Sequence, residues 1–107
     1  MNPASPRFTV GLVGKAVEQF EQLTARAEQR DLRELLSAVF RHVIQTLETS
    51  PREWGDPFRN YHGLNATGYQ RAILPARLWI EYAVHNVDPV VWISRLIALE
   101  GSLFAGG

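Results

Sequence analysis

Residues 69–99 read YQRAILPARLWIEYAVHNVDPVVWISRLIAL, and this stretch decides the fold. It is rich in β-branched and aromatic residues, which are enriched in strands. Turn-forming residues, HNVDP at 85–89, divide it, and Pro75 interrupts its first half. We therefore expect an antiparallel sheet whose strands are residues 69–74, 77–84 and 90–99.

The composition is that of an ordinary globular chain. Its 107 residues correspond to a single domain, 1–107, with 46% hydrophobic and 21% charged residues. It has no cysteine, which excludes disulfide and thiolate chemistry. No segment approaches the ~18 consecutive apolar residues of a membrane span. The N-terminus also lacks the basic and apolar regions of a signal peptide, so we expect no membrane association and a cytoplasmic location.

The charges cancel, since 11 basic and 11 acidic residues give a formal net charge of zero. Broad binding to nucleic acid depends on neutralising many phosphates with basic residues. The net charge therefore does not support a protein whose main role is to bind nucleic acid.

A strand and two helices precede the sheet. Residues 7–12 alternate apolar and other residues with the period of a half-buried strand. Apolar residues then recur every three or four positions over residues 15–30 and again over 32–49, which is typical of amphipathic helices. We expect Asp31 to cap the second helix and Pro51 to end it. The short junction predicts an antiparallel helical hairpin.

The order of these elements predicts the fold class. Residues 51–57 are rich in loop-forming residues, and 58–64 are expected to form a short strand. Helices followed by a run of strands indicate an α+β fold. We expect an N-terminal strand and a two-helix antiparallel hairpin packed on one face of a three- to four-stranded, mainly antiparallel sheet. The chain ends, 1–6 and 105–107, are expected to be flexible.

The strand at 77–84 separates its residues onto two faces. The face expected to pack on the helices carries Leu78, Ile80, Tyr82 and Val84. Arg77, Trp79 and Glu81 lie on the other face, where Trp92 of the neighbouring strand is expected to join them. Aromatic residues flanked by arginines are typical of binding surfaces, and Arg59 is included in this one. Alternatively, the tryptophans lie under the C-terminal tail or in a dimer interface.

Arg95 interrupts the last strand, whose residues are otherwise apolar on both faces. Two arrangements would accommodate its charge in a central strand. Either a β-bulge turns the side chain outward, or a carboxylate pairs with it.

Few residues suggest catalysis. The sequence has no Gly-rich phosphate loop, zinc-ligand spacing or nucleophile elbow, so we expect no cofactor and no metal. His62 follows Tyr61 and lies near Arg59. Such a set has the groups needed to remove a proton from a ribose 2′-hydroxyl and to stabilise charge on a phosphate. Alternatively, the segment is simply a polar strand or loop.

Three segments carry a family resemblance: RFTVGLVGKAVEQFEQL at 7–23, LETSP at 47–51, and YQRAILPARLWIEYAV followed by VVWISRL between 69 and 96. Together they resemble the RelE/ParE superfamily of bacterial toxins. The resemblance implies a strand, two helices and a block of strands. RelE-like members cleave ribosome-bound mRNA with basic residues and a tyrosine on the sheet, whereas ParE-like members poison DNA gyrase without being nucleases.

The resemblance also implies site residues. Arg77 matches the arginine of the fourth-strand motif, Arg95 matches a basic position near the end of the last strand, and Arg71 lies in the segment that carries lysines in RelE-like members. Together with His62 and Tyr61, which were identified from their own segment, the candidate catalytic residues are Arg77, Arg71, Arg95, His62 and Tyr61.

This chain departs from the RelE pattern, because Gln70 and Ala72 replace the lysines and Phe104 stands near the terminal tyrosine. The resemblance implies a toxin-like component of a type II toxin–antitoxin system that binds a cognate antitoxin and acts by protein binding or on RNA. If the chain is an enzyme, it is an mRNA endoribonuclease. The alternative is a non-catalytic interaction module or homodimer that keeps only the fold. The net charge supports neither RNA, the ribosome nor gyrase as a target.

Overall fold

The computed structural model describes residues 7–106. Its elements in chain order are β1 (Thr9–Leu12), α1 (Lys15–Gln29), α2 (Arg33–Thr49), α3 (Pro51–Trp54), β2 (Asp56–Tyr61), the 3-10 turn η1 (His62–Leu64), β3 (Ala66–Ile73), β4 (Leu78–His85) and β5 (Val90–Ala98). The predicted flexibility of residues 1–6 and 107 concerns positions outside the described residues. No helix in the described part of the chain is long and apolar enough to cross a bilayer.

The five strands form one mixed sheet in the order β1-β5-β4-β3-β2. Strands β2 to β5 pair antiparallel with their neighbours, and β1 pairs parallel with β5. The predicted α+β class is therefore confirmed, but the predicted count of three to four strands is wrong. The helices connect β1 at one edge of the sheet with β2 at the other edge, and β1 joins beyond β5 as the fifth strand.

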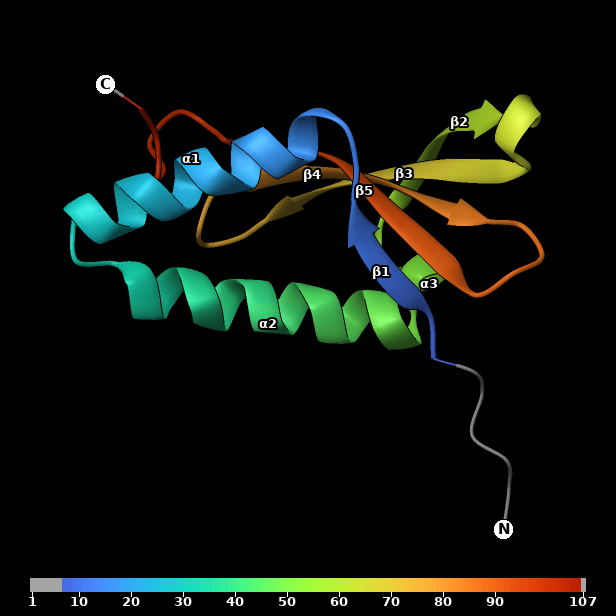
Figure 1. The fold of residues 1–107 in the computed structure, drawn as a ribbon, viewed down its shortest axis with the longest axis horizontal. Helices are drawn as coiled ribbons and strands as arrows, with labels where there is room; N and C mark the ends of the chain where they lie inside the picture. The colour runs from blue at the N-terminus through green and yellow to red at the C-terminus, as the bar shows by residue number, and fades with distance from the viewer. Residues whose placement is uncertain (1–6, 107) are drawn as a thin grey trace, which may run out of the picture.

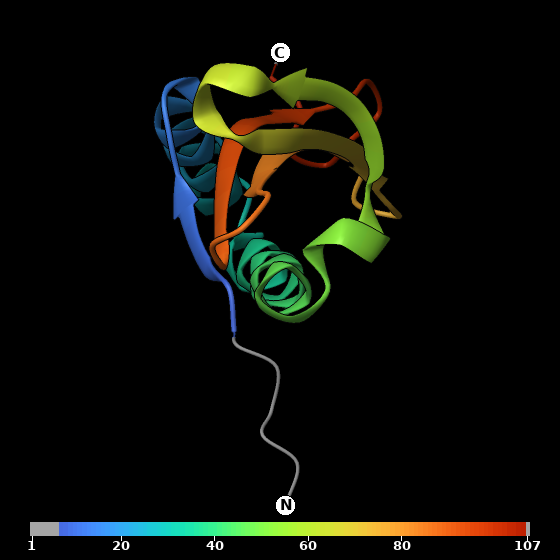
Figure 2. The same cartoon turned by 90° about the vertical axis from the view of Figure 1, so that its right-hand side faces the viewer.

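The two long helices run antiparallel, as the short junction predicts (Figure 1). Seen nearly along α2, the sheet curls over the end of this helix, while α1 lies to one side (Figure 2). Both helices share a core with one face of the sheet, here called the inner face. The most buried side chains of this core include Leu23, Ala27, Leu36, Val43, Leu47, Leu78, Ile80, Tyr82, Val84, Val91, Ile93, Leu96 and Phe104. The inner face predicted for β4 is thus confirmed.

The junction between α1 and α2 differs from the prediction at Asp31. This residue has a φ of 57°, in the left-handed region, and the residue before α2 is Leu32. The N–H of Leu32 donates to the carbonyl of Ala27 at 2.7 Å, and that of Asp31 donates to Glu28 at 3.3 Å. These bonds form a Schellman motif that ends α1. Asp31 therefore closes the first helix instead of capping the second, because Asp tolerates the left-handed conformation better than most residues.

Residues 51–54 form the short helix α3, where a loop was predicted. Pro51 occupies a first-turn position, where its missing N–H costs no hydrogen bond. The buried Tyr82 holds this turn: its hydroxyl donates to the carbonyl of Pro51 at 2.6 Å and accepts the N–H of Gly55 at 2.8 Å. A Cβ at Gly55 would lie 2.6 Å from that hydroxyl, so the close approach requires glycine.

Aromatic stacking completes the support of α3. The ring of Tyr82 stacks on Tyr69 at 5.4 Å and on Trp54 at 6.0 Å between centroids. Burial raises the pKa of Tyr82 to about 12, because the phenolate would lose its hydration. The phenol is therefore neutral at physiological pH and serves as a fixed hydrogen-bonding group inside the protein.

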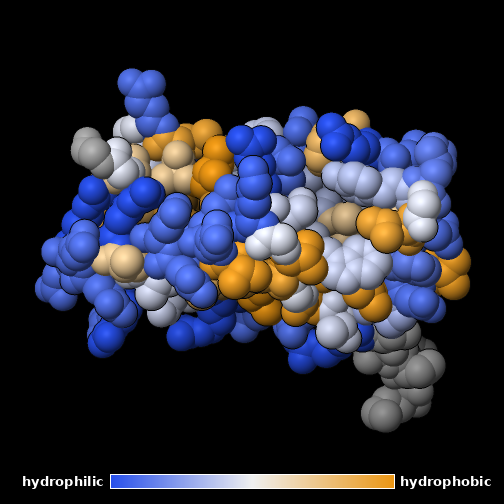
Figure 3. Space-filling view, turned by 45° about the horizontal axis from the view of Figure 1, so that its top comes forward, coloured by the Kyte–Doolittle hydropathy of each residue, from blue (hydrophilic) through white to orange (hydrophobic). Residues whose placement is uncertain are grey.

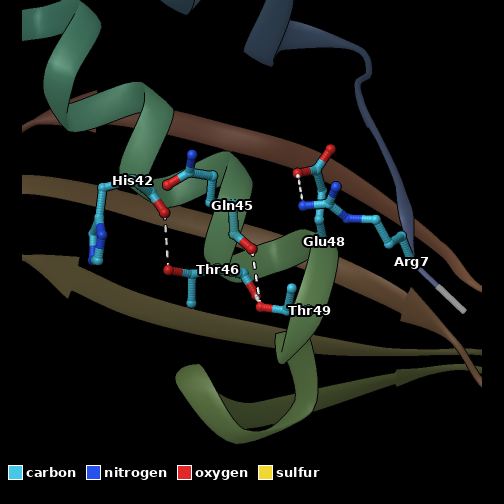
Figure 4. Close-up of polar contacts among 6 residues, drawn as sticks. All are labelled: Arg7, His42, Gln45, Thr46, Glu48 and Thr49. Carbon is cyan, nitrogen blue, oxygen red and sulfur yellow. Dashed lines mark hydrogen bonds and ion pairs between the residues drawn. The ribbon is translucent and has the colours of Figure 1, made fainter. Parts of the chain in front are cut away.

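The start of β1 is attached to the end of α2. The N–H of Phe8 donates to the carbonyl of Glu48 at 2.9 Å, and the guanidinium of Arg7 lies 3.4 Å from the Glu48 carboxylate (Figure 4). In the same turns of α2, the hydroxyls of Thr46 and Thr49 donate to the carbonyls of His42 and Gln45, respectively. The contacts of Phe8 and Arg7 with Glu48 hold the chain beside the helix where β1 begins.

Candidate functional site

The side of the sheet opposite the core, here called the outer face, carries most of the predicted binding residues. Residues aligned across β3, β4 and β5 form three successive rows on this face. The rows are Ala72–Trp79–Ile97, Gln70–Glu81–Arg95 and Gly68–Ala83–Trp92. Trp79 and Trp92 share the face, as predicted, but the row containing Glu81 and Arg95 separates them.

Both arrangements considered for Arg95 occur together. The pairing of β4 with β5 shifts between Glu81, which lies opposite Arg95, and Tyr82, which lies opposite Ile93. Ser94 is therefore the extra residue of a β-bulge, and this bulge turns Arg95 outward while Leu96 stays in the core. Once outward, the Arg95 guanidinium lies 3.5 Å from the Glu81 carboxylate.

Glu81 is the centre of a small polar network on the outer face. One carboxylate oxygen accepts the indole N–H of Trp79 at 2.9 Å and also faces Arg95. The hydroxyl of Ser94 donates to the backbone carbonyl of Glu81 at 3.3 Å. The Arg95 side chain remains 53% exposed, so most of its donors stay open to a ligand.

An apolar groove of about 450 Å³ lies beside this network. We call it the outer groove. Its lining residues come from four separate segments of the chain and are Val13, Tyr61, Leu64, Ala83, Trp92 and Ser94. Figure 3 shows apolar side chains across the middle of the molecule and in smaller groups towards its edges, among hydrophilic residues. Val13 and Leu64 are 38% and 61% exposed, so their apolar side chains are accessible to a ligand in the groove.

Small residues on β3 and β4 provide the depth of the groove. Ala83 forms part of its lining, and neighbouring Gly68 lies beneath the ring of Tyr61. A Cβ at Gly68 would lie 2.8 Å from this ring and 3.3 Å from that of Phe58. Glycine is thus needed for the aromatic ring to approach the strand this closely. Across the groove, the ring of His85 meets Trp92 edge-on at 6.1 Å and supports the other wall.

A second, polar hollow of about 370 Å³ adjoins the outer groove, and Ser94 lines both. We call it the basic hollow, because its charged lining residues are Lys15 and Arg95. Gln19 also lines it and accepts the backbone N–H of Leu96 at 2.8 Å. The side chain of Gln19 therefore replaces a neighbouring strand where β1 has ended, and holds α1 against the edge of β5.

The candidate catalytic residues do not form one site. Arg71 shares the inner face with Tyr69 and Ile73. Its guanidinium donates to the carbonyl of Trp54 and lies over the indole at 5.1 Å. Arg77 lies in the turn before β4, with a φ of 56° and its guanidinium next to Gly101. The strand position predicted for Arg77 is therefore wrong.

His62 and Tyr61 lie at the other end of the sheet. Tyr61 ends β2 and faces the outer groove, whereas His62 begins η1 and is exposed. Arg59 is exposed on the same side, with its guanidinium over the ring of Tyr61 at 5.8 Å and over that of Phe58 at 5.5 Å. Tyr61 and Arg59 thus belong to the binding surface.

Several residues of this surface were not predicted. Val13 and Lys15 lie where β1 leads into α1, and Leu64 lies in η1; the proximity of these two segments to the sheet surface depends on the fold. The available signal was the set of small residues on the outer face, Gly68, Ala83 and Ser94, which leave space in the middle of a sheet. Among residues 7–106, no three His, Asp or Glu side chains gather where they could hold a metal ion.

No protein-family model, curated protein or solved structure matches the chain. Function is therefore inferred from the geometry of the outer face and of the residues around it.

Proposed function

We propose that this protein is a non-catalytic, toxin-like component with a RelE/ParE-like fold, which acts by binding a partner protein through the outer groove. The observation that carries the proposal is an open apolar groove, walled by Tyr61 and Trp92, on a sheet face away from the core. The chain order of one strand, two long helices and a block of strands supports the proposed likeness to RelE/ParE toxins.

The positions of the candidate catalytic residues favour binding over RNA cleavage. General acid–base catalysis requires the groups to meet at one phosphate, within hydrogen-bond reach. His62 and Arg77 flank opposite ends of the eight-residue strand β3, which at about 3.3 Å per residue separates them by roughly 25 Å. Arg71 lies on the opposite face from Arg95. These residues therefore lack a common point at which to act on one substrate group.

The groove has the features of a protein-binding hot spot. Aromatic residues around a pocket that excludes water dominate the energetics of many interfaces. Each apolar side chain that a partner buries fully contributes roughly 1.5–3 kcal/mol, so two or three anchors offset a large part of the association entropy.

A pair of leucine variants tests this proposal. Leu64 and Leu103 have similar exposures, 61% and 58%, but only Leu64 lines the outer groove. Leu103 lines a second apolar groove, beside α2. The chain is expressed from an inducible promoter with and without the adjacent reading frame, and both complex formation and growth are measured. We expect growth arrest that the neighbouring product relieves, and a complex that Leu64→Asp abolishes and Leu103→Asp preserves.

Two results would contradict the proposal. Unaffected growth together with no complex would remove the toxin-like function. Loss of the complex in Leu103→Asp, with Leu64→Asp unchanged, would place the partner in the groove beside α2. Light scattering of the purified protein examines the alternative of a homodimer: a dimer that Leu64→Asp converts to a monomer would assign the outer groove to a second copy of the chain.

A further inference from the structure

We propose that the outer groove and the basic hollow together bind an amphipathic segment of a partner protein in which carboxylate side chains flank apolar anchors. This inference rests on the proposed protein-binding function and adds the chemistry of the partner. Ser94 lines both hollows, so they lie side by side and one extended segment can reach both.

The first half of this surface selects apolar side chains. The outer groove is lined by aliphatic and aromatic groups, and its side-chain hydrogen-bonding groups are the hydroxyls of Tyr61 and Ser94 and the indole N–H of Trp92. An apolar anchor would be dehydrated there without leaving many polar groups unpaired. Buried charges would be costly in this half, so the carboxylates of the ligand belong at its margins.

The second half supplies positive charge. Lys15 and Arg95 line the basic hollow, and Arg59 stands over Tyr61 at the other side of the outer groove. Among residues 7–106, no carboxylate lies within ion-pair distance of Lys15 or Arg59. Arg95 faces Glu81 at 3.5 Å and remains largely exposed. Three of the eleven basic residues therefore stand around the outer groove, and among residues 7–106 Glu81 is the carboxylate that pairs with one of them.

The same features favour a peptide over RNA. Recognition of single-stranded RNA combines base stacking with hydrogen bonds to base edges and a basic track for the phosphates. The outer groove has aromatic walls, but Val13, Leu64 and Ala83 provide no hydrogen-bonding side chains for base edges. Three cations around it are also few for a nucleic-acid site, whose affinity rises with each neutralised phosphate.

Two synthetic peptides test the inference. They have equal length and identical leucine and phenylalanine anchors, with glutamate at every remaining position in one and lysine in the other. Each is labelled with fluorescein, and binding is followed by fluorescence anisotropy, with a labelled oligouridine as a third probe. We expect the glutamate peptide to bind at least about tenfold more tightly than the lysine peptide, with an advantage that decreases as salt rises.

Matched charge reversals locate the effect. Lys15 and Arg33 are each the first residue of a long helix, and only Lys15 lines the basic hollow. Both Lys15→Glu and Arg33→Glu change the charge by the same amount and place a favourable acidic residue at a helix N-terminus. Lys15→Glu should weaken the glutamate peptide by about three- to tenfold, and Arg33→Glu should leave its affinity unchanged.

The outcomes distinguish this inference from the function on which it rests. Equal affinity for both peptides, lost in Leu64→Asp, would overturn the charge preference while retaining protein binding at the outer groove. An equal effect of Lys15→Glu and Arg33→Glu would overturn the assignment of the basic hollow. Binding of oligouridine with no binding of either peptide would overturn both this inference and the proposed function.

Discussion

Replacing Tyr82 with phenylalanine should destabilise the protein by removing a single buried oxygen. This hydroxyl joins the sheet to α3, since it donates to Pro51 and accepts from Gly55. Phenylalanine keeps the ring between Tyr69 and Trp54, so aromatic packing is largely preserved. The change in unfolding free energy then reports the two hydrogen bonds.

The expected loss is about 2 kcal/mol, because each buried hydrogen bond contributes roughly 1 kcal/mol net. The carbonyl of Pro51 is left without this donor inside the protein, whereas Gly55 is half-buried and its N–H is closer to solvent. At about 4–8 °C per kcal/mol for a domain near this size, the melting temperature should fall by roughly 10 °C.

Urea unfolding followed by circular dichroism measures this change. Tyr61→Phe is the matched control, because no hydrogen bond of the Tyr61 hydroxyl is found within residues 7–106 and the ring lies on the outer face. We expect the control to stay within about 0.5 kcal/mol of the wild type. If Tyr82→Phe also stayed within this margin, the hydroxyl would not be what holds α3.

Three further perturbations follow from the same structure. The pKa of Tyr82 rises from 10.0 unfolded to about 12 folded, so the folded state holds this proton more tightly. Its contribution to stability is complete below pH 10 and is lost as the pH rises towards 12, so the difference between wild type and Tyr82→Phe should shrink by roughly 2 kcal/mol over this interval; a constant difference in urea unfolding would contradict the assignment. Phe104 is fully buried, so Phe104→Ala should cost about 3–5 kcal/mol in thermal or urea unfolding, whereas Leu103→Ala, at a 58% exposed neighbour, should cost under about 0.5 kcal/mol. Gly68→Ala would press against the ring of Tyr61 and should cost about 1–3 kcal/mol while weakening partner binding; an unchanged near-ultraviolet circular dichroism spectrum would show that the ring had not moved.

Local sequence patterns predicted those helices and strands whose buried face follows from the periodicity of their apolar residues. The alternation along β4 identified Leu78, Ile80, Tyr82 and Val84 as the core face, because side-chain direction in a strand has a period of two. The helical stripes likewise placed α1 and α2. The short helix α3 was missed, because the group that holds its turn is Tyr82, 31 residues away in the chain. The cap prediction at Asp31 failed, because the same residue type is also accepted in the left-handed conformation that ends a helix.

The candidate site was predicted only in part. Trp79, Glu81 and Trp92 were assigned to the correct face, since that assignment depends on strand parity alone. The catalytic set mixed residues from both faces, because Arg71 lies on the inner face and Arg77 in a turn, and neither fact follows from a motif. For Arg95, the sequence allowed a bulge or an ion pair; the tertiary structure combined them, because the bulge at Ser94 brings Arg95 opposite Glu81.

The sequence by itself determined the α+β class, the helical hairpin, the central strands and the face of β4 that enters the core. These features depend on periodicity and on turn residues, which act within a few positions of the chain. Only the tertiary structure decided the five-stranded order, the parallel pairing of β1 with β5 and the outer groove. The groove joins segments from residue 13 to residue 94, and such proximity is set by the packing of the whole chain.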